Sequence, residues 1–148
     1  MYLSNMLPDD YTLATLSKVF GELEDLISGK LIHGKSVRIG FISDIVVANS
    51  VMSMYCKCGE LGEARKLFNE MPHKSVGSWN VVIAGYAARK DCIPNLDLWK
   101  LFRKMQADGF KPDAFTIATL LPVYYSNDGE LDYGRELHCY LVKNGLDL

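Results

Sequence analysis

The sequence has few cysteines, and they lack the spacing of common metal ligands or redox pairs. The four are Cys56, Cys58, Cys92 and Cys139, and no C-x-x-C pair occurs among them. Disulfide frameworks and zinc sites depend on such groupings. Cys56-x-Cys58 is only a weak metal signal because neither cysteine has a histidine close in the sequence. We therefore expect a reducing compartment, no metal and no cofactor.

The chain also lacks an excess of charge of either sign and long apolar runs. Sixteen basic and 18 acidic residues leave a net charge of −2, which argues against binding nucleic acid through charge alone. Contacts to base edges carry sequence information and do not need this charge, so the composition does not exclude nucleic-acid binding through base contacts. The longest uncharged runs, such as residues 75–88, fall short of the ~20 residues of a membrane helix. The N-terminus lacks signal-peptide and transit-peptide features, and we expect no membrane association.

Motifs of common catalytic centres are missing as well. The sequence has no glycine-rich phosphate loop, no Ser/His/Asp series and no HExxH. His33 and His138 occupy equivalent positions about three repeats apart, so they cannot share a metal and we expect structural roles for them. We predict neither enzymatic activity nor a small-molecule substrate.

What the sequence does contain is self-similarity. YTLATL at residues 11–16 returns as FTIATL at residues 115–120, and the Pro-Asp pair at 8–9 returns at 112–113, both 104 residues later. Self-similarity at a fixed period is the signature of a repeat protein. Equivalent residues of such a protein line one surface, so function has to be read across repeats.

Alignment of the middle of the chain defines four repeats. Ala48-Asn49 matches Trp79-Asn80 after 31 residues, whereas the LFxxM motif at 67–71 returns at 101–105, after 34, which places a three-residue insertion within 90–95. We draw the repeats at 10–44, 45–75, 76–113 and 114–148, with 1–9 as the end of a preceding repeat. Both ends fall inside repeats, so we expect a fragment of a longer array with an incomplete last repeat.

Each repeat has the pattern of two amphipathic helices. In the second repeat, apolar residues at 47, 51, 54 and 55 follow helical spacing, and a second stripe continues over 61–71 after a break at Cys58-Gly59. Glycines recur inside the second helices at Gly29 and Gly134, which suggests a close approach of helices. Pro122 predicts a helix kink, and Trp79 and Trp99 should pack between helices. The pattern predicts an all-α array of stacked antiparallel helix pairs.

The residue pattern of the repeats resembles that of a known family. The run VANSVMSMYCKCG at 47–59, followed by EARKLFNEMP at 63–72, closely resembles a short motif of the pentatricopeptide repeat (PPR) proteins. SWNVVIAGY at 78–86 resembles their standard motif, and G-[KR]-x-x-H in the first and last repeats resembles their long motif. The order long, short, standard, long is that of the PLS subclass. The tetratricopeptide repeat, a protein-binding module, keeps a period of 34 and fits the alternating lengths poorly.

The resemblance implies a right-handed α-solenoid that recognises single-stranded RNA, one base per repeat. In the family, the fifth and last residues of a repeat read the base together. These pairs are Ala14 with Asp44, Asn49 with Ser75, and Asn80 with Asp113. By resemblance, Asn/Ser favours cytidine and Asn/Asp favours uridine, so the second and third repeats should prefer 5′-CU-3′.

Asparagine at the fifth position also has a physical rationale. Its amide competes for backbone partners inside a helix, so recurrence at Asn49 and Asn80 suggests outward amides that offer donors and acceptors to a base edge. Unremarkable surface residues or local caps are the alternative. Ala14 and Ala118 have no polar side-chain atoms, and the long repeats are expected to be spacers or weak readers. Asp44 and Asp113 could also cap the following helices.

The second residue of each repeat sandwiches the base in this family. These residues are Tyr11, Val46, Gly77 and Phe115. Core packing is the alternative for the two aromatic residues. Gly77 departs from the aliphatic pattern and offers only backbone to a base, which weakens the uridine assignment of the third repeat relative to the cytidine assignment of the second.

Two classes of function follow. The first is an RNA-binding module of an organellar processing or editing factor, with other editing factors as further partners. The family alone implies its location, which is the mitochondrion or the chloroplast. The second is a protein-binding α-solenoid scaffold. A good base contact contributes roughly 1–3 kcal/mol, so two reading repeats give about millimolar affinity. We expect the isolated chain to bind RNA barely or not at all.

Overall fold

The computed structural model describes residues 9–88, 96–126 and 143. Within these residues the chain forms helices and no strand. The helices are α1 (Asp10–Glu22), α2 (Leu26–Arg38), the 3-10 helix η1 (Phe41–Ser43), α3 (Ile45–Lys57), α4 (Leu61–Glu70), α5 (Val76–Ala87), α6 (Leu96–Ala107) and α7 (Ala114–Ser126). The chain divides into an N-terminal part, Met1–Gly85, and a C-terminal part, Tyr86–Leu148.

The expected repeat boundaries can be set beside these helices. α1, α3, α5 and α7 begin at residues 10, 45, 76 and 114, where the four repeats were drawn. The boundaries, the long and short repeat types, the preceding repeat at 1–9 and the insertion stay predictions, and most of the fourth repeat lies outside the described residues.

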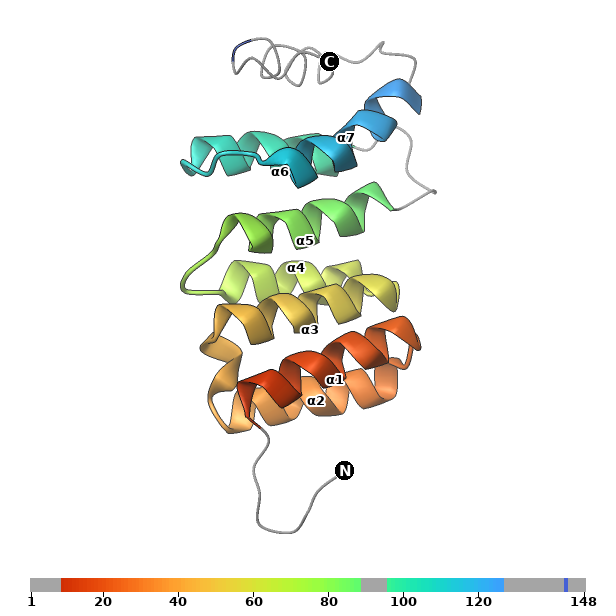
Figure 1. The fold of residues 1–148 in the computed structure, drawn as a ribbon, viewed down its shortest axis with the longest axis vertical. Helices are drawn as coiled ribbons and strands as arrows, with labels where there is room; N and C mark the ends of the chain where they lie inside the picture. The colour runs from red at the N-terminus through yellow and green to blue at the C-terminus, as the bar shows by residue number, and fades with distance from the viewer. Residues whose placement is uncertain (1–8, 89–95, 127–142, 144–148) are drawn as a thin grey trace. The chain divides into compact units, whose positions relative to one another are not determined.

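The N-terminal part contains two complete helix pairs. α1 packs against α2 and α3, and α3 packs against α4, so the α1/α2 and α3/α4 pairs lie next to each other (Figure 1). Acidic caps start three of these helices: Asp9 caps α1, Asp25 caps α2 and Asp44 caps α3. A cap of this kind satisfies backbone N–H groups that have no partner within the helix. The cap residues therefore fix where each helix begins.

The core of this part lies along α3 and α4. The buried apolar side chains on these two helices are Val47, Ala48, Val51, Met52, Met54, Tyr55, Ala64, Leu67 and Phe68. Trp79 of α5 is fully buried and meets Phe68 of α4 edge to face, with ring centroids 4.7 Å apart, a favourable aromatic geometry. The prediction that Trp79 packs between helices is thus confirmed. Trp99 of α6 is buried as well.

Gly29 allows α2 to approach α3 closely. A Cβ built at this position would lie 2.4 Å from the Met54 sulfur, so any larger residue would displace that side chain. The predicted close approach is confirmed for Gly29, while Gly134 lies outside the described residues. Helix α7 continues through Pro122, and the kink expected there stays a prediction.

Candidate functional site

Asn49, the fifth residue of the second repeat, lies in the second turn of α3 and is half-buried. Its amide does not project freely into solvent. The Ser78 hydroxyl, on the first turn of α5, donates a hydrogen bond to Asn49 Oδ1 at 2.7 Å. Because an amide oxygen and nitrogen lie on opposite sides of one carbon, this bond fixes which edge of the amide faces away from Ser78.

Ser75, the last residue of the second repeat, shares the same hydroxyl. The Ser75 backbone N–H donates to Ser78 Oγ at 3.1 Å, and the Ser78 backbone N–H donates to Ser75 Oγ at 3.2 Å. The two hydroxyl oxygens are 3.2 Å apart. This reciprocal pair caps α5. Through Ser78, the structure brings together Asn49 and Ser75, the two residues that the resemblance assigns to one base.

Gly77 borders this polar cluster. A Cβ built at Gly77 would lie 3.4 Å from Ser75 Oγ and 3.5 Å from Asn49 Nδ2. The missing side chain leaves both polar atoms open on the side of residue 77. A glycine here offers only backbone to a ligand, as the sequence indicated, but it also keeps the approach to the Asn49 amide nitrogen clear.

The second residues of the other repeats are exposed. Tyr11 is 77% exposed, Val46 64% and Phe115 56%. Core packing, the alternative for the two aromatic residues, is therefore wrong. Exposed apolar and aromatic side chains are suited to stacking on flat ligands, although their assignment to base stacking stays a prediction.

Asn80, the fifth residue of the third repeat, differs from Asn49. It is only 7% exposed, so the expectation of an outward amide is wrong for this residue. It follows Ser78 and Trp79, which are also buried, in a helix that is apolar around most of its circumference. Its proposed partner Asp113 is exposed, lies in the C-terminal part and caps α7: the Thr116 N–H and the Thr116 hydroxyl donate to Asp113 Oδ1 at 3.0 and 2.9 Å.

The first repeat offers less chemistry. Ala14 is half-buried and Ala118, its counterpart in the fourth repeat, is exposed. Asp44 caps α3 by accepting from the N–H groups of Val46 and Val47 at 2.8 and 3.2 Å. The capping roles considered for Asp44 and Asp113 are therefore confirmed. Their base-reading roles, and those of both alanines, stay predictions.

Burial shifts the pKa values of His33, Tyr55 and the two cysteines of the N-terminal part. His33 Nδ1 lies 2.6 Å from the Tyr55 hydroxyl; burial lowers the pKa of His33 and raises the pKa of Tyr55 to about 12. Burial also raises the pKa of Cys56 to about 11 and raises the pKa of Cys58. Thiols with raised pKa values are poor metal ligands, and no group of three metal-ligating residues occurs in the described part of the chain.

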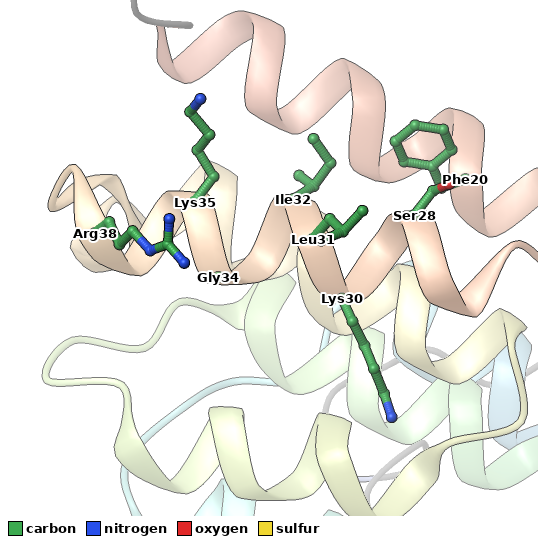
Figure 2. Close-up of a pocket in the computed structure, with 8 residues that line it drawn as sticks. All are labelled: Phe20, Ser28, Lys30, Leu31, Ile32, Gly34, Lys35 and Arg38. Atoms are coloured by element: carbon green, nitrogen blue, oxygen red, sulfur yellow. The ribbon is translucent and has the colours of Figure 1, made fainter.

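A groove elsewhere on the N-terminal part does not coincide with this site. Figure 2 shows its lining residues, which come from α2 apart from Phe20 of α1. Lys30 and Lys35 point in opposite directions, so their charges do not converge on one anion. None of the second, fifth or last residues of the repeats lines this groove. Among the described residues, no helix is both long and apolar enough to cross a membrane.

Sequence reasoning missed Ser78. The signal that could have revealed it is a hydroxyl at the third residue of a repeat, three positions after the preceding cap: Asp9 with Thr12, Ser75 with Ser78, and Asp113 with Thr116. Such spacing is typical of side chains that cap each other's backbone at a helix start. Only the structure shows that this hydroxyl reaches across to the preceding repeat.

Comparison with known proteins gives a consistent result. Residues 43–77 match the model of the PPR repeat family. A chloroplastic pentatricopeptide repeat-containing protein of Arabidopsis thaliana is 33% identical over 145 residues, which are 98% of this chain and 16% of the relative. A mitochondrial one from the same plant is 34% identical over 140 residues, 93% of this chain and 29% of the relative.

A solved structure extends the likeness to the fold. The crystal structure of the pentatricopeptide repeat protein PPR10 in complex with an 18-nt psaJ RNA element matches 97% of this chain with a TM-score of 0.76 and 28% identity, and the match covers 21% of that chain. Our chain thus spans less than a third of each of these proteins. The expected fold class, an all-α solenoid of antiparallel helix pairs, is confirmed. The chain belongs to the PPR repeat family.

Proposed function

We propose that this chain is a segment of an organellar RNA-binding protein of the PLS subclass that reads single-stranded RNA one base per repeat. The observation that carries the proposal is the cluster of Asn49, Ser75 and Ser78, in which the two expected base-reading residues share one hydroxyl. The family membership and the bound RNA in the PPR10 structure support it. The chloroplastic and mitochondrial relatives support an organellar location.

The chemistry of the cluster suits a base edge. With Oδ1 engaged by Ser78, the Asn49 amide offers its two N–H donors to a ligand. Gly77 leaves the space beside this nitrogen open, and the exposed side chain of Val46 provides an apolar surface for stacking. We propose that the second repeat binds cytidine and the third uridine, which gives 5′-CU-3′, and that the parent protein acts in RNA processing or editing.

A swap of the reading pair tests this function. The whole chain is placed within a longer array of PPR repeats, because two reading repeats alone supply only about millimolar affinity and a net charge of −2 adds little attraction for phosphates. Asn49→Thr combined with Ser75→Asn should move the preference at the matching base from cytidine to adenosine. Affinities for RNAs that differ only at this base measure the effect.

The matched control is the same array with Ser50→Ala. Ser50 adjoins Asn49, and its hydroxyl donates to the backbone oxygen of Val46 without entering the cluster. This variant should keep the cytidine preference. An unchanged preference after the Asn49/Ser75 swap would instead favour the protein-binding scaffold.

A further inference from the structure

Ser78 occupies a position that capping alone does not explain. Its side chain is fully buried, and its oxygen contacts the Ser75 backbone, the Ser75 hydroxyl and the Asn49 amide. A serine hydroxyl has one proton and two acceptor lone pairs. The proton goes to Asn49 Oδ1, and the lone pairs accept from Ser75. Every bonding capacity of this hydroxyl is therefore used between the last and the fifth residues of the second repeat.

The junction between the first two repeats shows that a cap does not require this hydroxyl. Asp44 caps α3 through two backbone N–H groups, although the third residue of that repeat is Val47. A valine thus fits the third position of a properly capped repeat. The hydroxyl of Ser78 has a second duty that Val47 lacks.

The distribution of hydroxyls in the sequence follows the reading residues. Ser78 and Thr116 follow the repeats whose fifth residues are Asn49 and Asn80, whereas Val47 follows the repeat whose fifth residue is Ala14. An alanine has no amide to orient. The hydroxyl therefore occurs at the two junctions that follow an asparagine and is absent at the junction that follows an alanine.

The two junctions differ in the acceptor that receives the hydroxyl proton. Beside Ser75, the Ser78 proton is donated to Asn49 Oδ1. Beside Asp113, the Thr116 proton is donated to the carboxylate at 2.9 Å, since a carboxylate can only accept hydrogen bonds. A hydroxyl that gives its proton to a carboxylate presents an acceptor, not a donor, to any neighbouring amide.

We propose that Ser78 is a positioning residue that orients the Asn49 amide, and that Ser75 sets this orientation through Ser78. This inference rests on the proposed function. With serine at 75, Ser78 holds Oδ1 and the amide presents N–H donors, which match the unprotonated N3 of cytosine. With aspartate at 75, Ser78 would accept from Nδ2, and the amide would turn over and present Oδ1, which matches the N3–H of uracil.

The test measures one switch in three backgrounds. In the longer array, Ser75→Asp should lower the ratio of cytidine to uridine affinity at the matching base by about tenfold. The same substitution should act as strongly with Ser78→Thr, which keeps the hydroxyl. Valine at position 78 is close to threonine in shape but can neither donate nor accept a hydrogen bond through its side chain. With Ser78→Val, Ser75→Asp should therefore change the ratio by less than about twofold.

Each outcome decides between distinct statements. If Ser75→Asp changes the ratio of cytidine to uridine affinity equally in the Ser78→Thr and Ser78→Val variants, residue 75 acts on the base directly. This result would overturn the positioning role of Ser78. If Ser75→Asp leaves the ratio unchanged even with Ser78 present, the proposed function fails as well. If Ser78 had a merely structural role, replacing it would lower the affinity for all four bases equally and would lower the melting temperature.

Two controls protect this reading of the experiment. Thr12→Ala removes the equivalent third-residue hydroxyl beside Asp9, whose pKa the Thr12 side chain helps to lower, and should leave the ratio unchanged. Circular dichroism checks that each variant is folded. If the valine variant does not fold, Ser78→Ala replaces it with the same expected loss of the switch.

Discussion

The first and second helix pairs follow the same plan but bury their first helices to different extents. Val19 and Met54 are each the tenth residue of a repeat, yet Val19 is 43% exposed and Met54 is fully buried. α1 contacts α2 and α3, whereas α3 contacts α1, α2 and α4 and also meets α5 through Ser78. Among the described helices of this part, the one with more neighbours thus buries its tenth residue more fully, as expected when stability is a sum of nearest-neighbour interfaces.

The same two pairs differ in the chemistry that they offer to a ligand. The first repeat has Ala14 at its fifth position, and its junction ends in Asp44 and Val47; the second has Asn49 next to Ser78. The helices that carry these residues are alike in length, 13 residues each. Under the proposed function, one backbone plan therefore holds either a reading repeat or a spacer, depending on two or three side chains.

The largest expected difference between the pairs concerns stability. Met54→Ala should lower the free energy of unfolding by about 2–5 kcal/mol, because it leaves a cavity in a closed core. Val19→Ala at the equivalent, partly exposed position should cost less than about 1 kcal/mol, since it removes little buried area. Urea denaturation of the two variants measures both. Equal losses would contradict the difference in burial.

An intermediate effect is expected when the first repeat is given the chemistry of the second. Ala14→Asn, in the repeat whose last residue is Asp44, should create only a weak uridine preference at the base 5′ of the CU site, up to about threefold. Adding Val47→Thr supplies the missing hydroxyl and should raise this preference to about tenfold. Affinities of the longer array for RNAs that vary at this base measure the gain. Val47→Thr alone serves as the control and should create no preference. Equal uridine preferences for Ala14→Asn with and without Val47→Thr would count against a role of the third-residue hydroxyl in orienting the amide.

The smallest expected effect concerns the pH dependence of His33. Its equivalent in the second repeat is Phe68, which does not titrate. Because burial lowers the folded pKa of His33, the unfolded chain binds the proton more readily, so stability is full above about pH 6.5 and declines as the pH falls below this value. His33→Phe should remove this decline between pH 6.5 and 5.5. Thermal unfolding at both pH values checks it, and an unchanged pH dependence would show that other groups cause the decline.

Much of the fold was predictable because helical repetition is written in the apolar pattern. The spacing of Val47, Val51, Met54 and Tyr55 indicated α3, and all four side chains are buried. Gly29 indicated the close approach of α2 and α3. The burial of Asn80 was not predictable from its register, because burial depends on how much of the surrounding helix is apolar, and α5 is apolar around most of its surface.

The resemblance indicated candidate positions for the site but no hydrogen-bond network among them. Asn49 and Ser75 could be paired by resemblance, yet no periodicity indicated that Ser78 joins them. A hydrogen bond between repeats depends on the distance and rotation between neighbouring helices, which packing determines. For the same reason, the effect of Gly77 on the approach to Asn49 was visible only from the distances.

A structure of the chain within a longer array, bound to RNA that carries CU at the matching site, tests the central claim most directly. We expect Asn49 Nδ2 to lie about 3 Å from an acceptor on the cytosine edge, with Ser78 Oγ still bound to Asn49 Oδ1. A complex in which the base contacts neither Asn49 nor Ser75, while the RNA remains bound, would contradict the account.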